Sequence, residues 1–332
     1  TNSIFFPARE KNDALNLEDF SKIIQYHFDK QFYSSFSSWE DAFNYISSKA
    51  HDKVSIIIDE FPYIIEENPS VKSILQHVID HSWKQKNIFL ILCGSSVSIM
   101  ENDVMGRKSP LHDRQTSTLE IKPFDYYESS GFFPEYNNID KILAYGILGG
   151  VPRYLEAFDS SKTIEQNIAT RIIQNGSYLY EEPMNLLKAE VRETNIYNSI
   201  LSAIASGKNK MIDIANFIHE DRTKVAKYLN TLQILRLIEK RVPCGESETS
   251  KKSIYVIKDN FFKFWFRYEF TNNVYYSILG SSEASKEIMK DISNFMGDIF
   301  EDICKEYLIR LARLRKLPFI PYHLGNLWGN NP

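Results

Sequence analysis

The chain has 332 residues, 43% of them hydrophobic and 25% charged, with a formal net charge of −4. This predicts about two or three globular domains and argues against a basic coat that binds nucleic acid over the whole surface. No run approaches the ~18 apolar residues of a membrane span, and the start has no signal-peptide form, so we expect a cytoplasmic protein without a membrane partner.

The first third of the chain alternates short apolar runs with helical patterns. Residues 3–6, 54–58 and 88–92 are short, apolar runs typical of strands, whereas residues 17–28, 39–46 and 71–79 repeat apolar side chains at helical spacing. Leu119 and Ile121 indicate a weaker strand. Strands that are apolar throughout and alternate with helices are typical of a parallel sheet in an α/β fold.

After about residue 140 the chain becomes mostly helical. Helical stripes at residues 196–204, 211–218 and 225–232 are followed by strand patterns at 237–242 and 254–257, on either side of a polar loop. Three helices followed by a β-hairpin predict a winged helix-turn-helix. The three cysteines, Cys93, Cys244 and Cys304, form no CxxC pair, which argues against a zinc site or a disulfide framework and fits a reducing compartment.

The strongest chemical signal is the stretch VSIIIDE at residues 54–60. It places Asp59 and Glu60 at the carboxyl edge of a buried parallel strand, where open α/β sheets bind ligands. There the first carboxylate can hold Mg²⁺ through its waters, and the second can orient or deprotonate an attacking water. The alternative is a solvated strand end that is acidic by chance.

The next strand runs directly into Gly94, Ser95 and Ser96. A serine at the tip of the strand beside the acidic one can hydrogen-bond the γ-phosphate or the attacking water, and an ordinary Gly-Ser turn is the alternative. Together the two strand ends predict a site for ATP and Mg²⁺ more specifically than either does alone.

Five stretches resemble the prokaryotic ATPase family in the AAA+/STAND branch of the P-loop NTPases: IIIDEFPYI, LILCGSSVSIM, MGRKSPLHDR, LEIKPFDYYE and ILGGVPRYLE. The C-terminal part resembles the PD-(D/E)xK nuclease-like domain that often follows. The resemblance implies an incomplete ATPase core (1–135), a helical lid (136–188), the winged helix (189–258) and the start of an α/β nuclease-like domain (259–332). It also implies an ATP-driven switch or hydrolase.

The resemblance assigns roles to the two strand ends by position. Asp59 resembles the Walker B magnesium ligand and Glu60 the catalytic glutamate. Ser95 or Ser96 resembles the sensor at the tip of the adjacent strand.

Two further elements are matched by the same resemblance. Arg114, or else Arg107, is similar to the arginine that follows the sensor strand and approaches the phosphates. Gly149, Gly150 and Pro152 resemble the glycine-proline turn of the helical lid, whose proline packs near the adenine. The alternative for this turn is a loop that only breaks a helix.

No GxxxxGK[ST] motif occurs in the sequence. Without this loop, no ring of backbone N–H groups surrounds the phosphates and no lysine reaches the β and γ oxygens. In the resembled family the loop-bearing strand lies between the sensor strand (88–92) and the last strand (118–122). We therefore expect a gap in the sheet there, a chain that begins after the loop, and poor ATP hydrolysis by this chain alone.

The nuclease-like resemblance centres on residues 297–302, GDIFED, with Glu301 at the acidic position. Such a site needs further acidic residues and a lysine on a following hairpin to gather a metal and a water. The chain stops before any such hairpin, and an ordinary acid on a helix surface is the alternative for Glu301.

A local basic region suggests a second class of function. Residues 220–258 hold nine Lys/Arg against five Asp/Glu. Arg222, Lys224 and Lys227 begin the third helix, where a recognition helix meets a major groove, and Lys251 and Lys252 lie in the wing. The second hypothesis is therefore a DNA-binding regulator or defence protein that uses the ATPase fold as a scaffold. The third is an inactive protein that binds a protein client.

Overall fold

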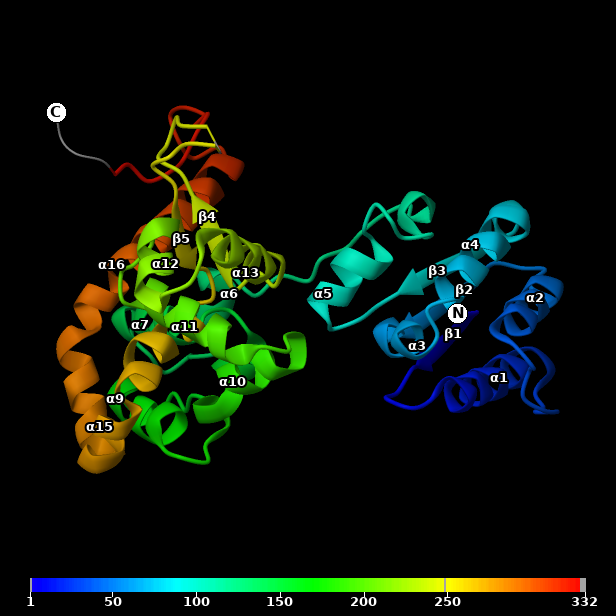
Figure 1. The fold of residues 1–332 in the computed structure, drawn as a ribbon, viewed down its shortest axis with the longest axis horizontal. Helices are drawn as coiled ribbons and strands as arrows, with labels where there is room; N and C mark the ends of the chain where they lie inside the picture. Colours follow the sequence, from blue (N-terminus) through cyan, green and yellow to red (C-terminus); the bar gives the residue numbers. More distant parts are fainter. Residues whose placement is uncertain (1, 248, 329–332) are drawn as a thin grey trace. The chain divides into compact units, whose positions relative to one another are not determined.

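The computed structural model describes residues 2–247 and 249–328 of the chain (Figure 1). It contains two compact units, and the boundary between them in the sequence lies between Glu120 and Ile121. Within the described residues, no helix is both long enough and apolar enough to cross a membrane. All three cysteines are free thiols.

The first unit is built on a three-stranded parallel sheet in the order β1-β2-β3. Its strands are β1 (Ser3–Pro7), β2 (Val54–Asp59) and β3 (Ile88–Leu92). In register, Phe5 lies opposite Ile57, which lies opposite Ile91. The three strongest predicted strands and their parallel direction are therefore confirmed.

Helices cover only one face of this sheet. The helices that lie between and after the three strands in the chain are α1 (Asp13–Asp29), α2 (Trp39–Lys49), α3 (Phe61–Glu67), α4 (Val71–His81), η1 (Trp83–Gln85), α5 (Val97–Ile99), η2 (Met100–Val104) and η3 (His112–Arg114). On the covered face, Phe6 is 1% exposed and packs with its ring 5.1 Å from that of Phe20 in α1. On the other face, Phe5 is 54% and Phe89 is 51% exposed.

The sheet has one open face and an unpaired edge at β3 among the described residues, and the gap for a loop-bearing strand stays a prediction. Within the described residues β3 pairs only with β2, so its second edge has no strand beside it. Parallel sheets are normally covered on both faces. The sheet thus has room for another βα unit beside β3.

The strand predicted at residues 118–122 is wrong. These residues form an irregular connection in which Leu119 and Ile121 are each 85% exposed. A strand needs a neighbour that accepts and donates its backbone hydrogen bonds. In the described chain the position next to β3 is empty, so the apolar pattern has nothing to pair with.

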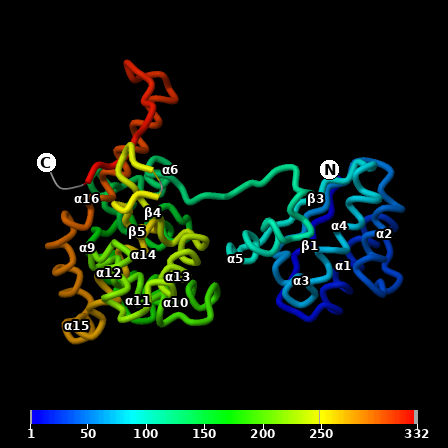
Figure 2. Tube along the Cα trace, turned by 45° about the horizontal axis from the view of Figure 1, so that its top comes forward, coloured from blue at the N-terminus to red at the C-terminus, as the bar shows by residue number. Residues whose placement is uncertain are grey.

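The second unit is mainly helical and has one continuous hydrophobic core. Its elements are α6 (Tyr126–Ser130), α7 (Asn138–Leu148), α8 (Pro152–Leu155), α9 (Ile164–Asn167), η4 (Ile168–Ile173), α10 (Tyr178–Glu190), α11 (Thr194–Ala205), α12 (Met211–Ile218), α13 (Arg222–Ile234), β4 (Ile238–Arg241), β5 (Ile254–Ile257), α14 (Asn260–Trp265), η5 (Phe266–Phe270), α15 (Thr271–Leu279) and α16 (Ser281–Arg313). Strands β4 and β5 form an antiparallel hairpin. The long helix α16 packs along η4, α7 and α9 (Figure 2).

Residues 121–135 belong to this second unit. The boundary between the two units therefore lies earlier in the sequence than the predicted domain boundary at residue 135. The backbone N–H of Phe124 donates to the carbonyl of Gly150 at 2.8 Å, and Phe133 is 1% exposed in the helical core. These contacts explain why the segment packs with the helices that follow it.

One carboxylate is buried in the helical core without full hydrogen bonding. Glu269 in η5 is 3% exposed, and its Oε2 has no hydrogen-bond partner among the described residues. Burial raises the pKa of Glu269 to about 7. An unpaired charge in this position would be costly, so the neutral form is favoured.

This burial predicts a pH-dependent stability. Between the ordinary Glu pKa of 4.5 and about 7, the carboxyl ionises in the unfolded chain while it stays protonated in the folded one, so the wild type loses stability in this window and levels off above it. Glu269→Gln removes this loss. We expect the melting temperature of Glu269→Gln, relative to wild type, to rise from pH 4.5 to 7 by about 3 °C or more. The exposed Glu283→Gln is the control, and equal pH profiles for both variants would contradict the prediction.

Candidate functional site

The carboxyl ends of β2 and β3 are joined by backbone hydrogen bonds beyond the strands themselves. The N–H of Cys93 donates to the carbonyl of Ile58 at 3.0 Å, and the N–H of Phe61 donates to the carbonyl of Cys93 at 2.9 Å. Between these bonds Glu60 takes a left-handed conformation, with φ 52°. This strained conformation turns the chain sharply from β2 into α3 and leaves the Glu60 side chain at the edge of the sheet.

Side chains from the two strand ends meet at this edge. Oε2 of Glu60 accepts hydrogen bonds from the N–H of Ser95 at 3.2 Å and from its hydroxyl at 3.1 Å. Ser96 lies within hydrogen-bond distance of Ser98, 3.3 Å between hydroxyl oxygens. Asp59 precedes Glu60 and, by strand alternation, lies on the uncovered face of the sheet. The structure therefore brings Asp59, Glu60 and Ser95 to one edge.

The electrostatics of Cys93 agree with this arrangement. Burial raises the pKa of the Cys93 thiol, and the negative charges of Asp59 and Glu60 raise it further. Both carboxylates therefore lie close enough to the end of β3 to interact with the same thiol.

The turn after β3 requires a glycine. A Cβ added at Gly94 would lie 2.5 Å from Cδ of Pro62 and 3.1 Å from Sδ of Met100. Pro62 lies in the first turn of α3, directly after Glu60 and Phe61. Gly94 thus allows the loop after β3 and the loop after β2 to approach each other closely.

The structure does not bring Arg114 to this edge. Its guanidinium donates two hydrogen bonds to Oδ2 of Asp80, at 2.8 and 3.2 Å. Asp80 lies in the last turn of α4, a helix that leads back toward the start of β3. The pKa of Asp80 is lowered to about 2, mainly by the hydrogen bonds from Arg114. For Arg114, as for Arg107, an approach to phosphates stays a prediction.

In the second unit, the 149–152 turn is shaped by a close backbone contact. Gly149 has φ 68° and ψ −152°, a conformation that favours glycine. A Cβ added at Gly150 would lie 1.9 Å from the carbonyl oxygen of Phe124. Pro152 is the first residue of α8. Gly150 is therefore required by the close contact with Phe124, whereas Gly149 is favoured by its backbone conformation.

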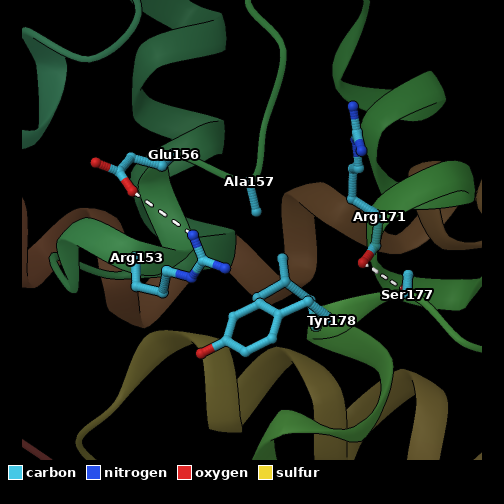
Figure 3. A pocket seen from close by; sticks show the side chains of 7 residues that line it. Arg153, Glu156, Ala157, Arg171, Ser177 and Tyr178 are labelled. Atoms are coloured by element: carbon cyan, nitrogen blue, oxygen red, sulfur yellow. Dashed lines mark hydrogen bonds and ion pairs between the residues drawn. The ribbon is translucent and has the colours of Figure 1, made fainter.

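A small pocket opens directly after this turn (Figure 3). It has a volume of about 250 Å³, and its lining comes from α8, η4 and the start of α10. The guanidinium of Arg153 lies 4.9 Å from the ring centroid of Tyr178 and 4.0 Å from Glu156. No sequence pattern singles out Arg153 or Tyr178. The only signal is the position of Arg153 next to the GGVP stretch.

The basic residues of α13 differ in their surroundings. Lys224 forms an ion pair with Glu220 at 3.0 Å. Arg222 and Lys227 are exposed and have no ion-pair partner among the residues that the structure describes. Two of the three predicted contact residues are thus available to an external anion.

The hairpin loop is held by the C-terminal segment. Lys252 pairs with Glu246 at 2.7 Å, and its carbonyl accepts a hydrogen bond from Nε1 of Trp328 at 3.0 Å. Lys251 is exposed. Of the predicted wing residues, only Lys251 therefore has a side chain without a partner in the described chain.

The acidic residues of the predicted nuclease-like helix make structural contacts. Glu301 accepts a hydrogen bond from the side chain of Asn326. The neighbouring Asp302 pairs with Arg241 of β4 at 2.7 Å and with Lys305 at 2.8 Å. Nothing in the described chain gathers further acids beside Glu301, so its nuclease-like role stays a prediction.

Asp59 fits the magnesium chemistry that the sequence predicts. In the described part of the chain, no three His, Cys, Asp or Glu side chains converge as a metal site of their own. Mg²⁺ usually binds one or two carboxylates together with nucleotide phosphates and water. A single carboxylate at an open sheet edge is therefore suitable for Mg²⁺ that arrives with a nucleotide.

Two parts of the chain match known protein families, and the fold is similar to that of a solved structure. Residues 3–158 match the family described as an ATPase domain predominantly from Archaea, and residues 265–332 match archaeal and bacterial proteins of unknown function. A Walker-type ATPase of Pyrococcus abyssi has a similar fold, with a TM-score of 0.56 at 18% identity over 80% of this chain and 84% of that chain.

Two proteins of Methanocaldococcus jannaschii are similar in sequence. The uncharacterized protein MJECL04 is 37% identical over 294 residues, which cover 87% of this chain and 64% of that protein. The uncharacterized protein MJ0424 is 33% identical over 89 residues, which cover 26% of this chain and 86% of that protein. The chain thus spans 64% of the length of the first of these relatives.

The close approach at Gly94 gives a stability prediction. Gly94→Ala forces a methyl group against Pro62, so we expect it to destabilise the first unit by about 1–3 kcal/mol. The control is Gly297→Ala in α16, where nothing lies within 4 Å and a helix should gain about 0.5–1 kcal/mol. Denaturant unfolding followed by tryptophan fluorescence measures both. Equal stability of Gly94→Ala and wild type would show that the two loops are not in contact.

Proposed function

We propose that this chain is the acidic half of an ATP-binding switch of the AAA+/STAND type. Two findings support the proposal: residues 3–158 match an ATPase domain predominantly from Archaea, and the fold is similar to that of a Walker-type ATPase. The observation that carries this proposal is the meeting of Glu60 with Ser95 at 3.1 Å, next to Asp59, at the carboxyl edge of a parallel sheet. Ligands of open α/β sheets bind at this edge.

Each of these side chains then has one role. Asp59 holds Mg²⁺, which when bound neutralises charge on the β- and γ-phosphates. Glu60 orients the attacking water or takes its proton, and Ser95 keeps the Glu60 carboxylate in place through two hydrogen bonds. Ser96 is the second candidate for contact with the γ-phosphate.

The proposal includes a partner for the sheet. The chain has no GxxxxGK[ST] loop, and β3 has a free edge beside an uncovered apolar face. A βα unit that carries a phosphate loop would cover this face and supply the missing N–H groups and lysine. We propose that the chain by itself is inactive as an ATPase, and that hydrolysis requires such a unit.

The second unit supplies the response in this proposal. In this proposal residues 136–188 are the lid segment, and Gly149, Gly150 and Pro152 form its glycine-proline turn. A nucleotide that binds one arrangement of the lid more tightly shifts the population toward it. That shift would change what the α11–α13 helices and the C-terminal helix can bind, including a protein client.

Asp59→Asn tests this function. In a version of the chain preceded by a βα unit with a GxxxxGK[ST] loop, we expect Mg-dependent ATP hydrolysis, and Asp59→Asn should reduce kcat roughly 100-fold because a bound metal stabilises transition-state charge by several kcal/mol. The matched control is Asp52→Asn, an exposed carboxylate just before the start of β2. If the loop-bearing version does not bind Mg-ATP, or Asp59→Asn equals Asp52→Asn, the function is wrong.

A second candidate function is DNA binding through a winged helix formed by α11–α13 and the β4–β5 hairpin. The observation in its favour is that Arg222 and Lys227 are exposed at the start of α13, where a recognition helix meets a major groove. In this hypothesis Arg222 and Lys227 contact phosphates at the groove, as do Lys224, Lys251 and Lys252, and the ATPase fold is a scaffold.

Salt dependence tests the DNA hypothesis. The double variant Arg222→Ala/Lys227→Ala should weaken binding and reduce the slope of log K against log salt by about 2, or about 0.9 for each lost phosphate contact. Lys286→Ala/Lys290→Ala on α16 is the control, because both lysines pair with glutamates of that helix. Absence of DNA binding at low salt would exclude the hypothesis.

A further inference from the structure

The β4–β5 hairpin leads directly into α14 through a short, fixed junction. Only Lys258 and Asp259 separate Ile257 of β5 from Asn260 of α14. The N–H of Lys258 donates to the carbonyl of Leu237 at 2.9 Å, just before β4. The carboxylate of Asp259 caps α14 by accepting the N–H of Phe262 at 2.9 Å. The start of α14 is therefore attached to the hairpin by a short segment with hydrogen bonds at both of its residues.

The first residue of α14 contacts the 149–152 turn. Nδ2 of Asn260 donates to the carbonyl of Tyr145 at 3.3 Å, and the same carbonyl accepts the N–H of Gly149 at 2.8 Å. A Cβ added at Gly149 would lie 3.7 Å from Cβ and N of Asn260. The end of α7, the turn and the start of α14 thus share one carbonyl group.

The second residue of α14 contacts the helix that follows the turn. The ring of Phe261, which is fully buried, lies 4.9 Å from the ring of Tyr154 in α8. The hydroxyl of Tyr154 donates to Oε1 of Glu182 in α10 at 3.1 Å. Both ends of the turn are therefore connected to the same two residues of α14.

The turn has little freedom on its other side. Gly150 lies so close to the backbone of Phe124 that a Cβ there would be 1.9 Å from the carbonyl oxygen. The N–H of Phe124 also donates to the carbonyl of Gly150 at 2.8 Å. A change in the turn is therefore more easily accommodated on the side of α14, through polar and aromatic contacts, than on the side of Phe124.

We propose that Asn260 and Phe261 form a joint that couples the conformation of the 149–152 turn to the β4–β5 hairpin. Asn260 is a positioning residue in this joint, because it acts through the Tyr145 carbonyl and touches no ligand. The coupling stands on the contacts of the second unit alone. Its use as a nucleotide-driven switch rests on the proposed function.

Amide hydrogen exchange of the 332-residue chain tests the joint without nucleotide. Gly149→Ala introduces a side chain where φ is 68° but leaves room for it, so it strains the turn without a clash. We expect amide exchange in β5 and in the first turn of α14 to become about five-fold faster or more. Five-fold is the lower end of the usual range of coupling factors between two sites. If Gly149→Ala fails to fold, Pro152→Ala perturbs the same turn by releasing its fixed φ.

Asn260→Ala decides whether the signal passes through the joint. The effect of Gly149→Ala on the hairpin should be several-fold smaller in the Asn260→Ala background and unchanged in the background of Asn294→Ala, an exposed asparagine of α16. Faster exchange confined to residues 145–155 would overturn the proposal. So would a Gly149→Ala effect of equal size in both backgrounds.

A nucleotide arm separates this inference from the proposed function. In a version with a phosphate loop, Mg-ATP should change exchange at the turn and in the hairpin, and Asn260→Ala should reduce only the change in the hairpin. If Mg-ATP changes neither segment while Gly149→Ala still reaches the hairpin, the joint stands and the ATP-driven switch is refuted. A change at the turn that reaches the hairpin equally well in Asn260→Ala would overturn the joint.

Discussion

The candidate site depends on the parallel pairing of β2 with β3. Two backbone hydrogen bonds, from Cys93 to Ile58 and from Phe61 to Cys93, extend this pairing past the strands and hold the two loops together. These bonds fix Ile58 and Phe61 on either side of the Asp59–Glu60 segment, and this stabilises the left-handed conformation of Glu60. If the pairing were lost, the carboxylates and the serine would belong to separate loops without a common chemistry.

The same sheet explains why the candidate site supplies only part of what the proposed nucleotide site needs. Its covered face is close-packed, whereas its other face exposes Phe5 and Phe89. Asp59 lies on this open face, at the end of the central strand β2. The chain therefore provides acidic and hydroxyl groups for a magnesium-bound phosphate, but no concave ring of N–H donors to hold one. Affinity for nucleotide and the ability to hydrolyse it are separate properties of two parts of such a fold.

The second unit is constrained by backbone proximity more than by charge. Gly150 fits against Phe124 only because it lacks a side chain, and the turn it belongs to is attached to α14 by Asn260 and Phe261. Segments more than a hundred residues apart in the chain thus share one joint. These contacts are the ones through which the proposed joint would pass a local change of conformation to the hairpin.

Local patterns were sufficient to predict the strands at residues 3–6, 54–58 and 88–92, the helices between them, and the meeting of Asp59, Glu60 and Ser95. Strand direction alone places those side chains, since parallel strands end at one edge. Leu119 and Ile121 show the limit, because an apolar alternation cannot supply the neighbour that a strand must pair with. Arg114 shows a second limit of local patterns. Its position after β3 in the sequence carries no information about its ion pair with Asp80.

By itself, then, the sequence determined that two carboxylates and a serine follow successive strands and that these residues hold no phosphate loop. From this pattern it predicted the type of chemistry. Only the tertiary structure showed that Arg114 forms an ion pair with Asp80 and that Gly150 has no room for a side chain beside Phe124. It also showed that the side chain of Asn260 donates a hydrogen bond to the carbonyl of Tyr145. The physical reason is that strand ends and helix faces follow from local periodicity, whereas ion pairs and close backbone contacts depend on residues that are distant in the chain and meet only after packing.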